Sequence, residues 1–217
     1  MLSRRASVLA SGLMPVSTVV FDLGGVVCRH QPELRLRELA RRYGRTVEDV
    51  HRILYATGFI GETELGHWNA EEIVSEIGAR LGRPVDRAEL EPAWLASFPV
   101  DEQVLELVGR IAVRHRTAIL TNNDLLLREA LLGARPDFAG RFGDIVFSAA
   151  IHAVKPAAEA FRRTLSIVNA EPSETLFIDD SDSHVAGALQ AGICAVRFQS
   201  ARQLAAELER HGLLDGS

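Results

Sequence analysis

Cysteine is scarce in this sequence, which has only Cys28 and Cys194 among its 217 residues. Two cysteines cannot build a disulfide framework of the kind that holds small secreted domains together. Neither cysteine lies in a CxxC pair or in a Cys/His cluster with the spacing of a zinc site. We therefore expect a cytoplasmic protein, because the cytoplasm keeps thiols reduced.

The chain also lacks long hydrophobic runs and an excess of positive charge. Its apolar stretch VSTVVFDLGGVV is interrupted by Asp22 and is shorter than the roughly 20 residues that a membrane-spanning helix needs. The formal net charge is -5, which provides no overall basic field for binding a phosphate backbone. We therefore expect neither a membrane nor a nucleic acid as a partner.

Strands and helices alternate along most of the chain. Residues 1–15 are predicted to be a loose tail, because Ser and Gly interrupt their short apolar run. From Val16 onward, short apolar runs alternate with stretches of helical periodicity. The predicted strands contain Val19–Phe21, TAILTNN, DIVFSA, TLFIDD and CAVRF. This alternation predicts an α/β fold, a doubly wound parallel sheet with helices on both faces.

A helical insertion interrupts the alternation after the first strand. Between residues 31 and 100 there is no strand-like run, and hydrophobic residues recur at helical spacings. We assign residues 31–100 to a small all-helical cap and residues 16–30 and 101–217 to the α/β core. Asp101 is placed to cap the core helix that follows it. The insertion is expected to lie over the carboxyl edge of the sheet as a lid.

Polar side chains follow several of the predicted strands. They are Asp22 after the first, Thr121 and Asn122 after the second, Lys155 after DIVFSAAIHAV, and Asp179 and Asp180 at the end of TLFIDD. In parallel α/β sheets, ligands bind beyond the carboxyl ends of the strands, where these residues should meet. Carboxylates from two strands can hold a Mg²⁺ ion, which prefers oxygen ligands. A hydroxyl, an amide and an ammonium can bind a phosphate, which Asp22 can attack to give an aspartyl-phosphate.

With these residues the chain resembles the haloacid dehalogenase superfamily. FDLGGVV, ILTNN, Lys155-Pro156 and FIDDSDSHVAGALQAGI are similar, in this order, to its four motifs, and the resemblance covers nearly everything from Val16 to about Phe198. The insertion is similar to the cap of the branch that includes sugar-phosphate phosphatases. The resemblance implies the following roles: Asp22 as nucleophile and metal ligand, Thr121 and Lys155 as phosphate binders, Asn122 as an auxiliary phosphate contact, Asp180 as a direct metal ligand, and Asp179 as a metal or water-shell partner.

Gly24 departs from the family pattern. Phosphatases of this family usually have a second aspartate here, which protonates the leaving group and then activates water. Glycine retains the backbone carbonyl that the family uses as a metal ligand, so Gly24 stays in the implied metal site. We expect a preference for good leaving groups, or an acid from the cap side, where His30, His67 and Glu62 are available. His184, which follows the Asp179-Asp180 pair within the last motif, is expected at the surface and outside the site.

The resemblance implies a Mg²⁺-dependent phosphatase that acts on a small phosphorylated metabolite through an aspartyl-phosphate. Sugar phosphates lead the substrate expectations, because related proteins with DLG in the first motif resemble phosphatases of sugar 1-phosphates. Two alternatives remain open. One is hydrolysis of 2-haloacids, which also begins with attack by an aspartate but needs no metal. The other is a catalytically weakened member that binds a phosphorylated ligand or a protein, which the missing acid at Gly24 motivates. The oligomeric state stays open.

Overall fold

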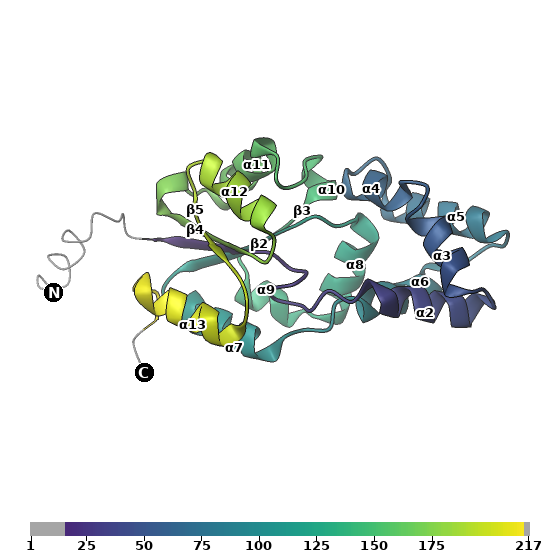
Figure 1. Cartoon of the computed structure of the whole chain (residues 1–217), viewed down its shortest axis with the longest axis horizontal. Helices are drawn as coiled ribbons and strands as arrows, with labels where there is room; N and C mark the ends of the chain where they lie inside the picture. Colours follow the sequence, from purple (N-terminus) through teal and green to yellow (C-terminus); the bar gives the residue numbers. More distant parts are fainter. Residues whose placement is uncertain (1–15, 215–217) are drawn as a thin grey trace, which may run out of the picture.

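A five-stranded parallel sheet forms the centre of the molecule (Figure 1). The computed structural model describes residues 16–214, so the predicted loose tail over residues 1–15 lies outside the described residues. The strands are β1 Thr18–Phe21, β2 Arg116–Thr121, β3 Asp144–Phe147, β4 Thr175–Asp179 and β5 Cys194–Arg197. Their order in the sheet is β3-β2-β1-β4-β5, and every neighbouring pair is parallel. The predicted doubly wound α/β fold is confirmed.

Core helices cover both faces of this sheet. They are α7 Glu102–Ala112, α8 Leu125–Ala134, α9 Asp137–Arg141, α10 Ser148–Ile151, α11 Ala158–Val168, the 3-10 helix η1 Pro172–Glu174, α12 Asp182–Gln190 and α13 Ala201–Arg210. In Figure 1, α11 and α12 lie on one side of the sheet, and α7, α9 and α13 lie on the other. Helix α7 begins as expected, because the Asp101 side chain accepts hydrogen bonds from the backbone N–H groups of Gln103 and Val104.

Strand β1 is buried on both faces, which explains its continuous apolar sequence. Successive side chains of a strand point to opposite faces, so Val19 and Phe21 pack into one hydrophobic cluster and Val20 into the other. The first cluster contains residues of α7 and α13, and the second contains residues of α11 and α12. Because β1 is the central strand, its carboxyl end lies in the middle of the edge where the carboxyl ends of all five strands meet.

Helices alone make up the insertion after β1, as predicted. They are α2 Pro32–Tyr43, α3 Val47–Leu54, α4 Phe59–Glu64, α5 Ala70–Leu81 and α6 Arg87–Ala96. The chain enters and leaves this region through two segments that pair with each other. The N–H groups of Arg29 and Gln31 donate to the carbonyls of Pro99 and Ser97, both at 2.9 Å. The assignment of residues 31–100 as a separate unit stays a prediction.

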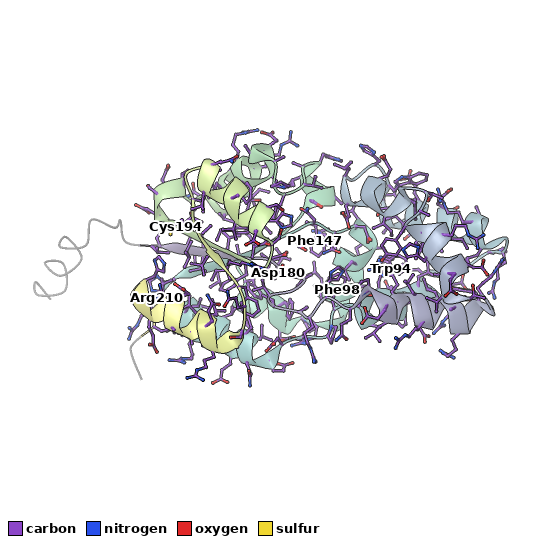
Figure 2. All side chains as sticks on the ribbon, viewed as in Figure 1. Trp94, Phe98, Phe147, Asp180, Cys194 and Arg210 are labelled. Atoms are coloured by element: carbon purple, nitrogen blue, oxygen red, sulfur yellow. The ribbon has the colours of Figure 1, made fainter. Side chains whose placement is uncertain are left out.

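The inserted helices contact the core through helix α8. Trp94 of α6 donates from Nε1 to Oδ2 of Asp124 at 2.9 Å, and Oδ1 of Asp124 caps α8 by accepting from the Leu127 N–H at 2.7 Å. The guanidinium of Arg35 lies 4.2 Å from the centre of the Trp94 ring. Trp94, Asp124 and Arg35 are all buried. Figure 2 shows Trp94 among the inserted helices and Asp180 at the sheet. One carboxylate thus joins the cap to the start of a core helix.

None of the helices within residues 16–214 is both long enough and apolar enough to cross a bilayer.

The contact between Trp94 and Asp124 gives a stability prediction. Trp94→Phe removes the N–H donor and leaves Oδ2 of the buried Asp124 without its partner, which should lower the free energy of unfolding by about 2 to 3 kcal/mol. Trp68→Phe is the matched control, because Trp68 packs edge-on against Phe59 and its indole makes no hydrogen bond to any residue in 16–214. Urea denaturation measures both. Equal losses in the two variants would contradict this role for Asp124.

Candidate active site

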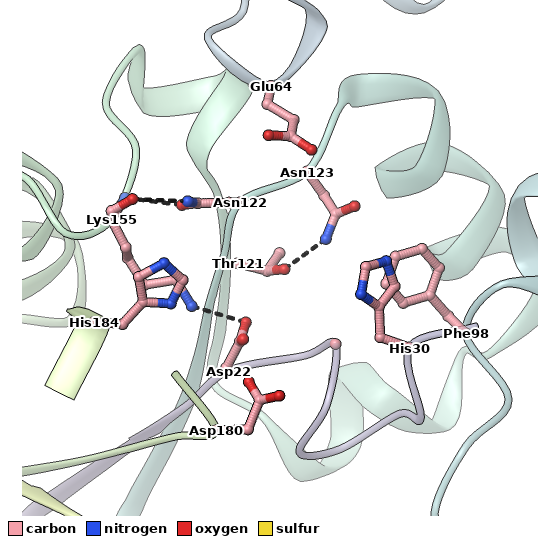
Figure 3. Close-up of a pocket in the computed structure, with 11 residues that line it drawn as sticks. Asp22, His30, Glu64, Phe98, Thr121, Asn122, Asn123, Lys155, Asp180 and His184 are labelled. Atoms are coloured by element: carbon pink, nitrogen blue, oxygen red, sulfur yellow. Dashed lines mark hydrogen bonds and ion pairs between the residues drawn. The ribbon is translucent and has the colours of Figure 1, made fainter. Parts of the chain in front are cut away.

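The predicted site residues meet at the carboxyl edge of the sheet, where the strand order reverses. Strand β1 pairs with β2 on one side and β4 on the other, with Phe21 opposite both Ile119 and Ile178. A cavity of about 200 Å³ lies at this edge (Figure 3). The predicted residues that line it are Asp22, Gly24, Thr121, Asn122, Lys155 and Asp180, and the others are His30, Glu64, Phe98, Asn123 and His184. This is the place where open α/β sheets bind ligands.

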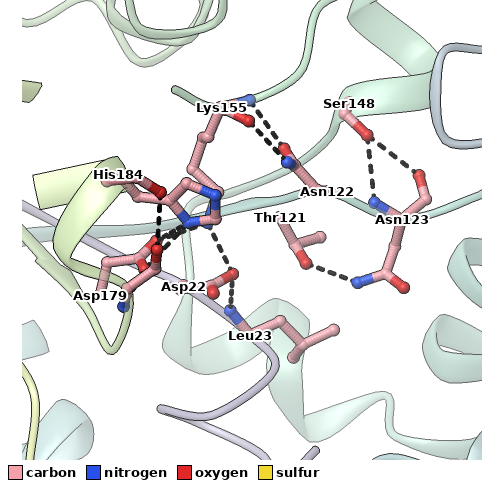
Figure 4. Close-up of polar contacts among 11 residues, drawn as sticks. Asp22, Leu23, Thr121, Asn122, Asn123, Ser148, Lys155, Asp179 and His184 are labelled. Carbon is pink, nitrogen blue, oxygen red and sulfur yellow. Dashed lines mark hydrogen bonds and ion pairs between the residues drawn. The ribbon is translucent and has the colours of Figure 1, made fainter. Parts of the chain in front are cut away.

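Lys155 holds the ends of two strands together. Its Nζ lies 2.8 Å from Oδ1 of Asp22 and 2.7 Å from Oδ2 of Asp179 (Figure 4). The exposed fraction of the side chain is 0% for Lys155 and Asp179 and 9% for Asp22. A buried ammonium needs this compensation, because an unpaired charge in a poorly solvated site is costly. The pairing therefore fixes both carboxylates relative to the cavity.

Asp22 keeps one oxygen free. Its Oδ1 accepts hydrogen bonds from Lys155 Nζ and, at 2.7 Å, from the Leu23 N–H, whereas Oδ2 accepts none from any residue in 16–214. Burial raises the pKa of Asp22 to about 6, although the Lys155 ammonium opposes this shift and the Asp179 carboxylate adds to it. The free oxygen is able to attack an electrophile or to bind a cation.

Asp179 is engaged by three partners, and its role as a metal or water-shell partner stays a prediction. Its Oδ1 accepts from the Ser181 N–H at 2.9 Å and lies 3.0 Å from His184 Nδ1, while Oδ2 accepts from Lys155. Burial alone would raise the pKa of Asp179, but the hydrogen bonds from His184, Lys155 and Ser181 keep it below its usual value. Asp179 does not line the cavity, whereas its neighbour Asp180 does. Its place in the structure is that of an anchor for Lys155.

His184 was expected outside the site, and the structure differs. It is about one-fifth exposed, bonds to Asp179 and lines the cavity. It lies in the first turn of α12, five residues after Asp179, so the start of this helix turns its ring back toward the end of β4. It lies within the last motif, but the sequence analysis gave it no role there. The short separation from an acidic strand end was the one available signal.

Asn122 and Asn123 form hydrogen bonds with different partners. The Asn122 amide donates to the Lys155 carbonyl at 2.9 Å, and its oxygen accepts from the Lys155 N–H at 2.8 Å (Figure 4). Its side chain thus holds the Lys155 loop, and it also lines the cavity, so the phosphate contact of Asn122 stays a prediction. Asn123, which the sequence reading did not select, donates to the Thr121 hydroxyl oxygen at 2.7 Å. The Thr121 hydroxyl lines the cavity and, because it accepts from Asn123, can itself donate to a ligand there.

Oxygen atoms around the cavity fit a hard divalent cation. Asp22 and Asp180 contribute carboxylates, and Gly24 lines the same cavity. Asp180 packs closely on this loop, since a Cβ added to Gly25 would lie 2.3 Å from Asp180 Oδ2. This set suits Mg²⁺, which prefers oxygen ligands.

A second group of possible ligands overlaps with this set. One atom from each of Asp22, Asp179 and His184 lies within 4.8 Å of the others. The Lys155 ammonium, however, already contacts Asp22 and Asp179 and supplies the positive charge between them. We favour the all-oxygen set for this reason, and because an imidazole nitrogen suits Mg²⁺ less well than oxygen does.

The space in front of Gly24 is tight for a longer side chain. A Cβ at this position would lie 3.1 Å from Cε1 of Phe98 and 3.6 Å from Cβ of His30. The His30 and Phe98 rings stack with centres 5.4 Å apart. The region that an aspartate at position 24 would enter is therefore taken by two side chains from the segments that link core and cap.

Of the acids and bases expected from the cap side, only His30 reaches the cavity. His67 and Glu62 pair with each other, are more than half exposed, and do not line the cavity. Glu64, two residues further along, does line it, and the sequence reading did not select it. Burial raises the pKa of Glu64 to about 7, with a smaller contribution from Asp124 and an opposing one from Arg35.

The chain matches a known protein family and known proteins. The family of haloacid dehalogenase-like hydrolases matches residues 16–192. A D-ribitol-5-phosphate phosphatase from Bacteroides thetaiotaomicron is 26% identical over 179 residues, which cover 78% of this chain and 85% of that protein.

Solved structures share the fold. A predicted HAD-like family hydrolase from Porphyromonas gingivalis has a TM-score of 0.75 at 23% identity, covering 91% of this chain and 99% of that one. A HAD family enzyme from B. thetaiotaomicron, in complex with magnesium and inorganic phosphate, has a TM-score of 0.71 at 19% identity, with 85% and 94% covered. An L-2-haloacid dehalogenase from Xanthobacter autotrophicus has a TM-score of 0.61 at 19% identity, with 90% and 83% covered. The chain belongs to the haloacid dehalogenase-like hydrolase family.

Proposed function

We propose that this protein is a Mg²⁺-dependent phosphatase that acts on a small phosphorylated metabolite, with sugar and sugar-alcohol phosphates as the leading substrates. The observation that carries the proposal is the free Oδ2 of Asp22, which shares one small cavity with Lys155, Thr121 and Asp180. The similarity to a D-ribitol-5-phosphate phosphatase supports the substrate class. The magnesium and phosphate bound by a structural relative support the cofactor.

The chain's own residues account for the transfer of the phosphoryl group. Oδ2 of Asp22 attacks phosphorus, the bond to the leaving oxygen breaks, and water later cleaves the aspartyl-phosphate to release phosphate. The Lys155 ammonium offsets negative charge on the phosphoryl oxygens, and the Thr121 hydroxyl donates to one of them. Mg²⁺, held by Asp22, Asp180 and the Gly24 carbonyl, would add positive charge at the same oxygens. Asp179 and Asn122 keep Lys155 in place.

The size and charge of the cavity favour a small phosphate ester. Its volume of about 200 Å³ lies below the ~300 to 1,000 Å³ typical of sites for drug-sized ligands. Dehalogenation of a 2-haloacid fits less well, although a dehalogenase shares the fold. Dehalogenation needs no metal, so the carboxylate of a haloacid would face the uncompensated carboxylate of Asp180, whereas a phosphate ester would share the cavity with Mg²⁺.

Turnover of a panel of sugar, sugar-alcohol, nucleotide and aryl phosphates tests the proposal. We expect phosphate release that requires Mg²⁺ and that Asp22→Asn lowers at least about 1,000-fold, because the amide cannot act as the nucleophile. Asp182→Asn is the matched control, since Asp182 is 77% exposed, pairs with Arg197 and lies outside the cavity. It should leave turnover unchanged.

Other outcomes of this experiment would replace the proposal. Chloride release from 2-haloacids without Mg²⁺ would identify a dehalogenase. Thermal protection by a phosphorylated ligand, with no turnover of any ester in the panel, would identify a binding protein.

Gly25→Ala tests the cation site. Both the new methyl group and the positive φ of +92° at Gly25 oppose the change, and the methyl group must displace the Asp180 carboxylate. We expect the affinity for Mg²⁺ or Mn²⁺ to fall by roughly 10-fold or more in isothermal titration. Gly82→Ala is the control, because Gly82 has a φ of +76° and no atom within 4 Å of its added Cβ. An unchanged affinity in Gly25→Ala would argue against Asp180 as a ligand.

A further inference from the structure

The proposed phosphatase reaction needs a residue that protonates the leaving group. When the bond between phosphorus and the leaving oxygen breaks, an alkyl leaving group needs a proton. Gly24 stands where the family usually carries the acid, and Phe98 and His30 occupy the space in front of it. A proton donor must therefore come from another part of the cavity wall.

Glu64 lies where such a donor is needed. It is the last residue of α4, and in Figure 3 its carboxyl group points into the cavity from the cap side, across from Asp22. Phosphoryl transfer is roughly in line, so the leaving oxygen departs on the side opposite the attacking Oδ2 of Asp22. The cap side of the cavity is thus the side that the leaving group faces.

The carboxyl group of Glu64 is free to exchange a proton. It makes no hydrogen bond or ion pair with any residue that the structure describes, although it is partly buried. Its raised pKa of about 7 means that the protonated and ionised forms are both populated near neutral pH. A group that must give a proton in one step and take one in the next works best under this condition.

The core holds the backbone around Glu64 in place. The Ser148 hydroxyl donates to the Glu64 carbonyl at 2.7 Å, and His152 Nδ1 lies 3.2 Å from the Leu65 carbonyl. The cap comes so close to α10 here that a Cβ on Gly66 would lie 2.1 Å from the Ala149 carbonyl oxygen. The position of Glu64 over the cavity is therefore determined by contacts with the core as well as with its own helix.

We propose that Glu64 is the general acid and base of this site; the proposal rests on the phosphatase function. In the first step, the bond between Asp22 Oδ2 and phosphorus forms, the bond to the leaving oxygen breaks, and the Glu64 carboxyl gives its proton to that oxygen. In the second step, the Glu64 carboxylate takes a proton from water, whose oxygen attacks phosphorus and displaces Asp22. Phosphate leaves, and both side chains return to their starting states.

His30 is the competing candidate on the same cavity wall. Burial lowers its pKa, and the nearby Arg35 guanidinium acts in the same direction, so the imidazole is neutral near neutral pH. A neutral imidazole is a weak proton donor. Its ring is also stacked on Phe98. Glu64 combines an available proton with a place opposite the nucleophile, which His30 does not.

Comparison of an aryl and an alkyl phosphate with Glu64→Gln tests the proposal. Nitrophenolate leaves without a proton, so the variant should still release one equivalent of it in a burst with a rate constant close to that of the wild type. The aspartyl-phosphate should then accumulate, because water is no longer deprotonated. Hydrolysis of a primary alkyl phosphate should fall by about 100-fold or more. Glu62→Gln, the same change two residues away and outside the cavity, should alter neither reaction.

The outcomes separate this proposal from the phosphatase function itself. A burst of nitrophenolate slowed as much as alkyl hydrolysis in Glu64→Gln, or no loss in either reaction, would overturn the role of Glu64. A selective alkyl loss in His30→Asn alone would transfer the role to His30. If the wild-type protein showed no phosphate release that depends on Asp22, the phosphatase function would fall and this proposal with it. Glu64→Asp provides a second variant: it keeps an acid and should retain part of the alkyl turnover that Glu64→Gln loses.

Discussion

The buried ammonium of Lys155 is the constraint on which the site depends. A positive charge with no exposed surface is tolerable only between negative partners, and the two carboxylates that surround it come from the ends of β1 and β4. Because Lys155 occupies one oxygen of Asp22, the other oxygen is left for chemistry. Because Asp179 must serve Lys155 and His184, it is not available to the cavity. The different roles of the adjacent residues Asp179 and Asp180 thus follow from the burial of Lys155.

The proposed chemistry is divided between the two parts of the molecule. The core supplies the nucleophile, the ammonium and the oxygen ligands, all at strand ends whose spacing the sheet fixes. The cap and its linkers supply His30, Phe98 and Glu64. Glycine at position 24 is what allows this arrangement, since any longer side chain there would compete with Phe98 for space. Position 24 of the core has no side chain, and Phe98 and His30 from the linkers of the cap lie in front of it.

Patterns that are local in the sequence were enough to predict the fold and most of the cavity. The buried run of β1, the capping residue Asp101 and the polar residues after the strands each depend on a few neighbouring positions, and parallel topology then brings the strand ends together. The resemblance, and not the local pattern, distinguished Asp180 as the direct ligand from Asp179, since successive residues point to opposite sides and only the tertiary structure decides which side is the cavity.

Contacts between distant parts of the chain explain the other differences. Asn122 holds a loop 33 residues away, so its engagement by Lys155 has no local signature. Glu62 and Glu64 are two residues apart on a short helix, which places them on different faces. Which face meets the cavity depends on how α4 rests on α10, through the hydrogen bond from Ser148. Sequence periodicity contains no information about that docking.

The proton affinity of Glu64 depends on charges that do not touch it. Asp124 raises its pKa and Arg35 lowers it, yet neither forms an ion pair with it. Trp94 contacts both groups. Its indole N–H donates to the Asp124 carboxylate, and the Arg35 guanidinium covers its ring face. The Nε of Arg35 has no hydrogen-bond partner within residues 16–214. A direct salt bridge with Arg35 would keep Glu64 ionised at neutral pH and leave it no proton to donate. By stacking the guanidinium on an aromatic ring instead, the cap keeps a cation near Glu64 without an ion pair that would hold its carboxyl group ionised.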